Sequence, residues 1–255
     1  MNELLLLHAN KFMLVLVRTS GVLIMAPMFG TGPVPARIKA ALILLIAVVL
    51  TPVVDGTAPQ MTEVAAFGVC AVRELFLGLA MGFAAFLAFS AFQLAGELVS
   101  TQMGLTMGEI ADPLYGGQSS AISQLNYVLA MLLFLAINGH HWFLQGLGAS
   151  FKTIPLGGAT LSAAVTRGMI DRFVEMFAAG LKLAAPAVCV LTLITLGMGM
   201  LARAAPMLNI LMISMSVRIA AGLVLTGVLI PYVFSFGRHL LAGLQSDLSS
   251  LIKAM

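Results

Sequence analysis

Charged residues are scarce in this sequence. Asp, Glu, Lys and Arg make up 9% of the 255 residues, against about 25% in soluble globular domains. Hydrophobic residues make up 60%, and the mean hydropathy is +1.06. This composition predicts an integral membrane protein, or one that lives in an equally apolar assembly. The net charge of +3 is small and spread along the chain, so neither nucleic acid nor a polybasic membrane patch is expected.

Residue sets that carry catalysis or bind metals are also missing. The chain has two cysteines, Cys70 and Cys189, both in apolar runs, which excludes a disulfide framework. It contains no HExxH, GxSxG or P-loop motif. His140 and His141 are adjacent, so on a helix their side chains diverge by about 100° and do not chelate one ion from one face. We expect this pair at a helix end or a membrane interface, no cofactor, and no enzyme activity.

Long apolar runs dominate what is present, and they predict an all-α protein with six or seven helices. The first run is interpreted as a retained helix and not a signal peptide. The third run exceeds one bilayer crossing of about 20 residues, so it is one long tilted helix or two helices joined at Gly78 to Gly82. The runs are Leu4 to Phe29, Ile38 to Val54, Val64 to Met103, Ile122 to Phe151, Phe173 to Leu201 and Asn209 to Phe236, with loop 152–171 before the fifth and an amphipathic tail to Met255.

Several charged residues interrupt the apolar runs. Each would cost about 2.5–3.5 kcal/mol at the centre of a lipid-exposed helix, so we expect buried charge that needs partners. Two GxxxG patterns, Gly78/Gly82 and Gly104/Gly108, predict close helix packing. The chain therefore looks built to pack against other apolar helices more than against lipid. The charges within runs are Arg18, Arg73, Glu74, Glu97, Lys182 and Arg218.

The segment from Gly96 to Ser120 is the most polar part of the middle of the chain. It holds Glu97, Glu109 and Asp112, five glycines and an Asp112-Pro113 step. Exposed to lipid, such a segment would leave backbone groups without hydrogen bonds. It suits a loop that is buried in protein or lines a watery path. An ordinary connector between two helices is the alternative.

Four stretches resemble the FliR family, the export-gate subunits of the flagellar type III secretion apparatus. They are RTSGVLIMAPMFGTGPVPARIKAAL from Arg18, GELVSTQMGLTMGEIADP from Gly96, LFLAINGHHWFLQGL from Leu133 and AAPMLNILM from Ala204. The likeness runs from about Arg18 to Leu223, and its central and NGHH blocks are specific. Virulence injectisomes have a counterpart with the same architecture, but the LFLAINGHH wording favours the flagellar branch.

The resemblance implies an all-helical subunit made of helical hairpins, in a pore-forming cone with FliP and FliQ copies. The chain would form a single export-gate domain, with a FliP-like portion over about residues 1–200 and a FliQ-like hairpin over about 201–255. FlhB would wrap the gate, FlhA would couple it to the proton gradient, and unfolded flagellar proteins would pass through. The location would be the bacterial inner membrane, in the flagellar basal body.

The resemblance also implies that segment 103–117 projects into the pore and helps plug it. One departure concerns the C-terminal hairpin: family members usually carry Gly-Phe-Pro where this chain has Ser214, Met215 and Ser216, which removes a kink. The predicted plug residues are Met103, Gly104, Leu105, Thr106, Met107, Gly108, Glu109, Ile110, Asp112 and Pro113.

Two other functions remain open from the residues. A small secondary transporter could use Glu97, Glu109 and Asp112 as proton or cation carriers, although no convincing internal repeat of the kind such transporters show is present. A membrane scaffold without a pore role is the third. Neutralising single carboxylates separates a carrier from a plug.

Overall fold

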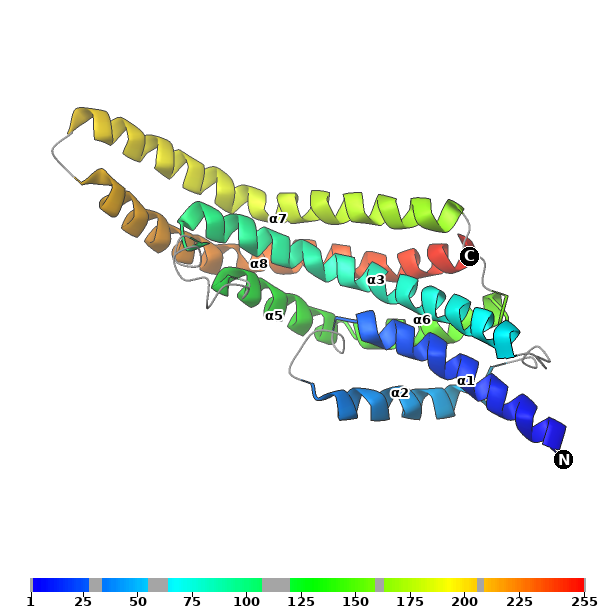
Figure 1. Cartoon of the computed structure of the whole chain (residues 1–255). Helices are drawn as coiled ribbons and strands as arrows, with labels where there is room; N and C mark the ends of the chain where they lie inside the picture. Colours follow the sequence, from blue (N-terminus) through cyan, green and yellow to red (C-terminus); the bar gives the residue numbers. More distant parts are fainter. Residues whose placement is uncertain are drawn as a thin grey trace. The chain divides into compact units, whose positions relative to one another are not determined.

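The structure is a computed structural model that describes residues 2–27, 34–54, 64–106, 120–158, 163–205 and 209–254. These ranges contain seven α-helices and no strand, which confirms the predicted all-α class (Figure 1). The helices are α1 (Asn2–Met25), α2 (Ala36–Leu50), α3 (Val64–Met103), α5 (Ala121–Ala136), α6 (Gly139–Thr153), α7 (Ala163–Ala204) and α8 (Ile210–Ala254).

The sequence left open whether the third apolar run is one long helix or two, and the structure shows one, α3. It is a single helix of 40 residues that passes through Gly78 and Gly82 without a break. The run predicted as one helix from Ile122 to Phe151 is instead two helices, α5 and α6, bent by 70°. Asn138 lies at the bend with φ 57°, a left-handed conformation that asparagine tolerates better than most residues and that a continuous helix does not contain.

The two C-terminal helices are longer than the sequence predicted. Helix α7 begins at Ala163 and not near Phe173, so it includes residues 163–171, a little less than half of the predicted loop 152–171. Helix α8 runs from Ile210 to Ala254 and includes the predicted separate tail. Helix α8 continues without interruption through Ser216, where family members usually have proline. Helices α7 and α8 each contain one internal proline, Pro186 in α7 and Pro231 in α8.

The chain forms two compact units. Unit 1 contains residues 1–88, 138–174 and 241–255, and unit 2 contains residues 89–137 and 175–240. In unit 1, α1, α2, α6 and the first part of α3 enclose a core that includes Leu14, Met81 and Phe151. In unit 2, Phe89 meets Phe134 edge-on, with ring centroids 5.4 Å apart. The predicted portions 1–200 and 201–255 stay a prediction.

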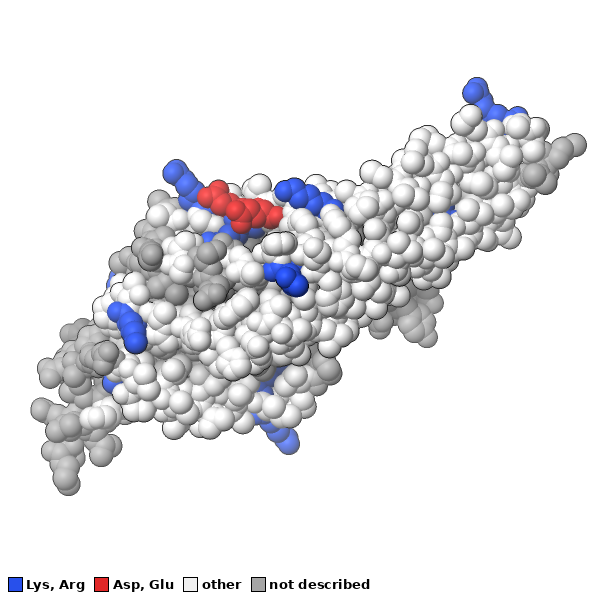
Figure 2. Space-filling model, turned by 180° about the vertical axis from the view of Figure 1, so that it is seen from behind, with Lys and Arg blue, Asp and Glu red and all other residues white. Residues whose placement is uncertain are grey.

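In the part of the chain that the structure describes, three helices are long and apolar enough to cross a membrane: Ala65–Met103, Ala164–Ala204 and Met212–Leu244. The bent pair α5 and α6 makes a fourth if it counts as one span. Figure 2 shows a face on which charged side chains are few and most of the surface is uncharged. These helices differ in burial within the chain, since 61% of the most apolar window of α3 is buried but 6% of that of α8. Helix α8 therefore leaves most of its apolar surface open.

Candidate functional site

The predicted plug segment begins where α3 ends. Gly104 has φ 82°, its N–H donates to the Thr101 carbonyl at 3.0 Å, and the N–H of Leu105 donates to the Ser100 carbonyl at 3.2 Å. This pair of hydrogen bonds is a Schellman motif, the helix ending that needs a left-handed residue and favours glycine. The structure describes Met103 to Thr106 of the segment. The other predicted plug residues, Met107, Gly108, Glu109, Ile110, Asp112 and Pro113, lie outside the described residues.

Gly104 corrects the reason given for a small side chain at this position. The GxxxG pattern predicted close packing, but a Cβ atom added at Gly104 would meet no atom of a described residue within 4 Å. The requirement for glycine comes from the positive φ, which costs an ordinary L-residue about 1–2 kcal/mol. The sequence motif alone does not separate these two reasons, because both select glycine.

Met103 holds the start of the segment against α8. Its side chain is fully buried, and a Cβ atom added at Gly222 would overlap it. The glycine on α8 therefore makes the space that Met103 fills. The flexible thioether suits a gap of this kind.

Ser120 holds the other end of the segment. It is the N-cap of α5, where its hydroxyl oxygen accepts from the N–H of Ser123 at 3.2 Å. The same hydroxyl donates to Glu97 Oε2 on α3 at 2.5 Å. Ser123 in turn donates to the Gln93 carbonyl of α3 at 3.0 Å. Met103 and Glu97, the two α3 residues at these anchors, are therefore less than two helical turns apart.

The charges Arg18 and Glu74 form a buried ion pair in unit 1. Arg18 Nε lies 2.5 Å from Glu74 Oε2, and both side chains are 0% exposed. Arg18 also donates to the Ser150 hydroxyl and the Ile154 carbonyl at 3.3 Å, and Glu74 Oε1 accepts from the N–H of Gly157 at 2.8 Å. A buried pair is stable when its remaining hydrogen bonds are satisfied in this way.

Glu74 is one of the charges expected to need a partner, and it finds that partner within the chain, because Arg18 neutralises it. Arg73 differs from its neighbour and is exposed on the chain. Adjacent helical residues point about 100° apart, so both do not face one core. Glu97 is half-buried and bonded to Ser120.

Gly78 and Gly82 lie where α3 crosses α1. A Cβ atom at Gly78 would overlap the carbonyl oxygen of Arg18, and one at Gly82 would lie 2.6 Å from the carbonyl oxygen of Val22. Gly21 on α1 completes the crossing, since a Cβ atom there would lie 2.8 Å from the Leu75 carbonyl oxygen. The sequence analysis did not single out Gly21, which has no GxxxG partner of its own.

The histidine pair lies in the first turn of α6, so its predicted place at a helix end is confirmed. The ring centroids of His140 and His141 are 4.3 Å apart. Within the described residues, no three His, Cys, Asp or Glu side chains are placed to hold a metal ion.

Sequence analysis also missed Ser120, although a serine directly before an apolar run is an N-cap signal.

These features define an all-helical membrane protein with paired internal charge and a glycine-bearing segment anchored at both ends. Residues 9–244 match the family described as bacterial export proteins, family 1. The chain is 30% identical to the flagellar biosynthetic protein FliR of Escherichia coli strain K12 over 246 residues, covering 96% of this chain and 94% of that protein. It is 29% identical to FliR of Bacillus subtilis strain 168 over 231 residues, covering 89% of each. The chain therefore belongs to the FliR family of bacterial export proteins, as its sequence motifs predicted.

Proposed function

We propose that the chain is a non-enzymatic subunit of the flagellar type III protein export gate, located in the inner membrane as part of the basal body. In this proposal it forms part of the protein-conducting pore, and segment 103–117 acts as a plug. The observation that carries the proposal is the anchoring of this segment at both ends, by Met103 against Gly222 and by Glu97 with Ser120. Full-length similarity to flagellar biosynthetic proteins supports the assignment to flagella.

FliP and FliQ copies are the proposed neighbours. Helices α7 and α8 support this because they expose large apolar side chains such as Leu196, Met200, Met212 and Val224. Partner helices would cover these apolar side chains and so remove their surface from contact with water. FlhB and FlhA are proposed as further partners, and unfolded flagellar proteins as the cargo.

The plug action follows from the anchors and from the residues between them. The anchors hold Met103 and Ser120, on the two sides of the segment, at one place on unit 2. Leu105, together with Met107 and Ile110 in the sequence, supplies apolar side chains. Apolar side chains at a constriction exclude ions by dewetting, and methionine re-packs easily when the segment moves.

Deletion of Leu105 to Ile110 tests the proposal. Cells that express the variant with FliP and FliQ should assemble the complex but lose the membrane seal. The measurement is ion flux, or sensitivity to a solute that the membrane normally excludes. An assembled complex that stays tight without these residues would place the seal elsewhere.

Substitutions at Ser120 provide a matched test of the anchor. Ser120→Asn keeps an N-cap oxygen and offers an amide donor to Glu97, so it should stay tight. Ser120→Asp keeps the cap but repels the Glu97 carboxylate, so it should leak. Equal flux through both variants would mean that the Glu97–Ser120 hydrogen bond does not position a plug.

A further inference from the structure

Helices α7 and α8 form an open groove on unit 2. One wall is a stripe of α7 with the spacing i, i+3, i+4, and the other is a stripe of α8 with the spacing i, i+3, i+7. Residues at these spacings share one face of a helix, so the two walls run side by side over one to two turns. The lining residues are Lys182, Ala185 and Pro186 of α7, and Leu229, Tyr232 and Phe236 of α8.

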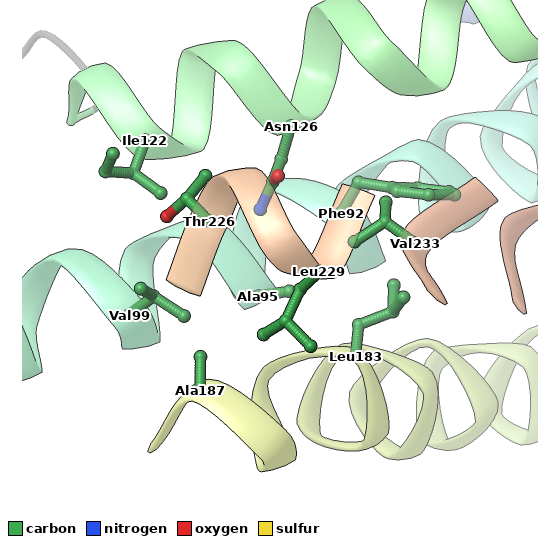
Figure 3. Close-up of a pocket in the computed structure, with 10 residues that line it drawn as sticks. All are labelled: Phe92, Ala95, Val99, Ile122, Asn126, Leu183, Ala187, Thr226, Leu229 and Val233. Atoms are coloured by element: carbon green, nitrogen blue, oxygen red, sulfur yellow. The ribbon is translucent and has the colours of Figure 1, made fainter. Parts of the chain in front are cut away.

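The groove lies outside the packed face of α7. Figure 3 shows Leu183 and Ala187 directed from α7 toward a pocket that α3, α5 and α8 also line. Both side chains are buried. Lys182 directly precedes Leu183 in the helix, so its side chain points about 100° away, and it is exposed. The groove is therefore an outer surface of unit 2.

Lys182 brings a charge into this groove, and the charge lacks a counter-ion. The part of the chain that the structure describes places no carboxylate in ion-pair contact with its ammonium. Its backbone carbonyl, in contrast, is satisfied, because it accepts from the Tyr232 hydroxyl at 3.0 Å. The nearest charged residues along α7 are Glu175, seven positions before, and Arg203, 21 positions after. The ammonium therefore stands in an apolar stretch without a partner.

The shape of the groove favours a helix over a small molecule. Sites for small molecules enclose most of their ligand, whereas this groove is open along one side. An apolar helix lays one face into a groove of this kind, with contacts spaced at i, i+3, i+4 and i+7. The small side chain of Ala185 allows such a helix to approach closely.

The charge in the groove defines what that helix carries. A lysine within a membrane-spanning segment generally faces protein and pairs with an opposite charge. A carboxylate on the incoming helix would supply the counter-charge of Lys182. A helix without a carboxylate would bury the ammonium unpaired, which opposes binding.

We propose that the groove between α7 and α8 is the docking site for an apolar helix of a neighbouring gate subunit, which carries one Asp or Glu opposite Lys182. This inference rests on the proposed function, because that function surrounds the chain with other helical subunits. Apolar contacts with Leu229 and Phe236 hold the helix in the groove. The ion pair with Lys182 fixes its register and selects the partner.

The first test is a cross-link in the complex of the full chain with FliP and FliQ, its proposed neighbours. A membrane-permeant carbodiimide joins an amine to a carboxylate that touches it, and the reagent takes up the water that is lost. We expect an amide between Lys182 and an Asp or Glu of a FliP or FliQ copy, identified by mass spectrometry. Lys182→Arg keeps the charge but has no amine, so its complex should assemble and lack this product.

Lys182→Met tests the ion pair without the reagent. It should weaken the association of FliP and FliQ with the chain by about tenfold or more, because the partner's carboxylate is left buried alone. Arg167→Met is the control, since Arg167 is an exposed charge near the start of the same helix, and it should leave the association unchanged. Equal recovery of FliP and FliQ with both variants would overturn the proposal.

A photoreactive residue, p-benzoylphenylalanine, in place of Phe236 identifies the occupant of the groove. Cross-links to a FliP or FliQ copy support the proposal, whereas cross-links to phospholipid alone, or within this chain alone, would overturn it. These results are separable from a failure of the proposed function. An unchanged chain that recovers neither FliP nor FliQ would contradict that function, and the docking site with it.

Discussion

The hydroxyl of Tyr232 on α8 donates a hydrogen bond of 3.0 Å to the carbonyl oxygen of Lys182 on α7. Lys182 lies four residues before Pro186, and proline has no N–H to bond the carbonyl at that position. Tyr232 thus supplies the donor that α7 lacks. Both helices line one open groove here, together with Leu229 and Phe236. The turn of α7 that ends at Pro186 therefore receives a hydrogen bond from α8 within unit 2.

Tyr232→Phe should destabilise the protein by about 1 kcal/mol, the net value of a typical hydrogen bond. The effect should be modest because Tyr232 is 37% exposed. In a Pro186→Ala background the loss should shrink, because alanine restores the backbone N–H and the Lys182 carbonyl regains its helical partner. Thermal unfolding of the detergent-purified complex is measured for the unchanged protein, the two single variants and the double variant, which together form a double-mutant cycle. Equal losses in both backgrounds would show that the two residues act independently.

Glu74→Gln should destabilise the protein by about 3–5 kcal/mol, because it leaves the Arg18 guanidinium buried without a counter-charge. The double variant Arg18→Met with Glu74→Met should be more stable than either single variant, since it removes both charges at once. The amount of chain in the membrane, and its resistance to proteolysis, report the difference. A Glu74→Gln protein with normal level and resistance would contradict the importance of the pair.

Gly78→Ala should force α1 and α3 apart, because the new methyl group overlaps the Arg18 carbonyl oxygen, which is backbone and does not rotate away. A loss of about 1–3 kcal/mol is expected from overpacking. Gly68→Ala on the same helix is the control, since a Cβ atom there meets nothing within 4 Å. Thermal unfolding of the two variants should differ clearly. A Gly78→Ala protein as stable as the control would disprove the tight crossing.

Gly104 should accept asparagine better than valine. Asparagine tolerates the left-handed conformation, whereas a β-branched residue is strained at φ 82°. Export of flagellar proteins into the medium should therefore fall more for Gly104→Val than for Gly104→Asn, at similar protein levels. If crowding mattered instead, both side chains would impair export equally.

The helices were predictable because their apolar runs are long, but their ends were not. The bend at Asn138 has a local signal, the Asn-Gly dipeptide, yet apolar residues on both sides hid it. The extension of α7 back to Ala163 depends on packing that no single window of sequence contains. Helix ends are generally harder to predict than helix centres, because the last turns fray and their limits vary by a residue or two.

The candidate site was likewise predicted in part: its residues were, but their contacts were not. The sequence singled out Arg18, Glu74 and Glu97 as charges that require partners, and the structure supplies partners for all three within the chain. Which residues pair was not predictable, because Arg18 and Glu74 are 56 positions apart and one sequence carries no information on contacts of that range. Gly78 and Gly104 share a motif yet serve different needs, a close crossing and a positive φ.

The buried pair also sets an order for biosynthesis. Arg18 belongs to the first helix, but the Ser150 hydroxyl and Ile154 carbonyl that it bonds are 132 and 136 positions later. At about 5–20 residues per second, the ribosome needs on the order of ten seconds to reach them. During that time the guanidinium of α1 is without the hydrogen bonds that Ser150 and Ile154 later supply. The amino-terminal helix is therefore completed by the middle of the chain, and its final docking comes late in synthesis.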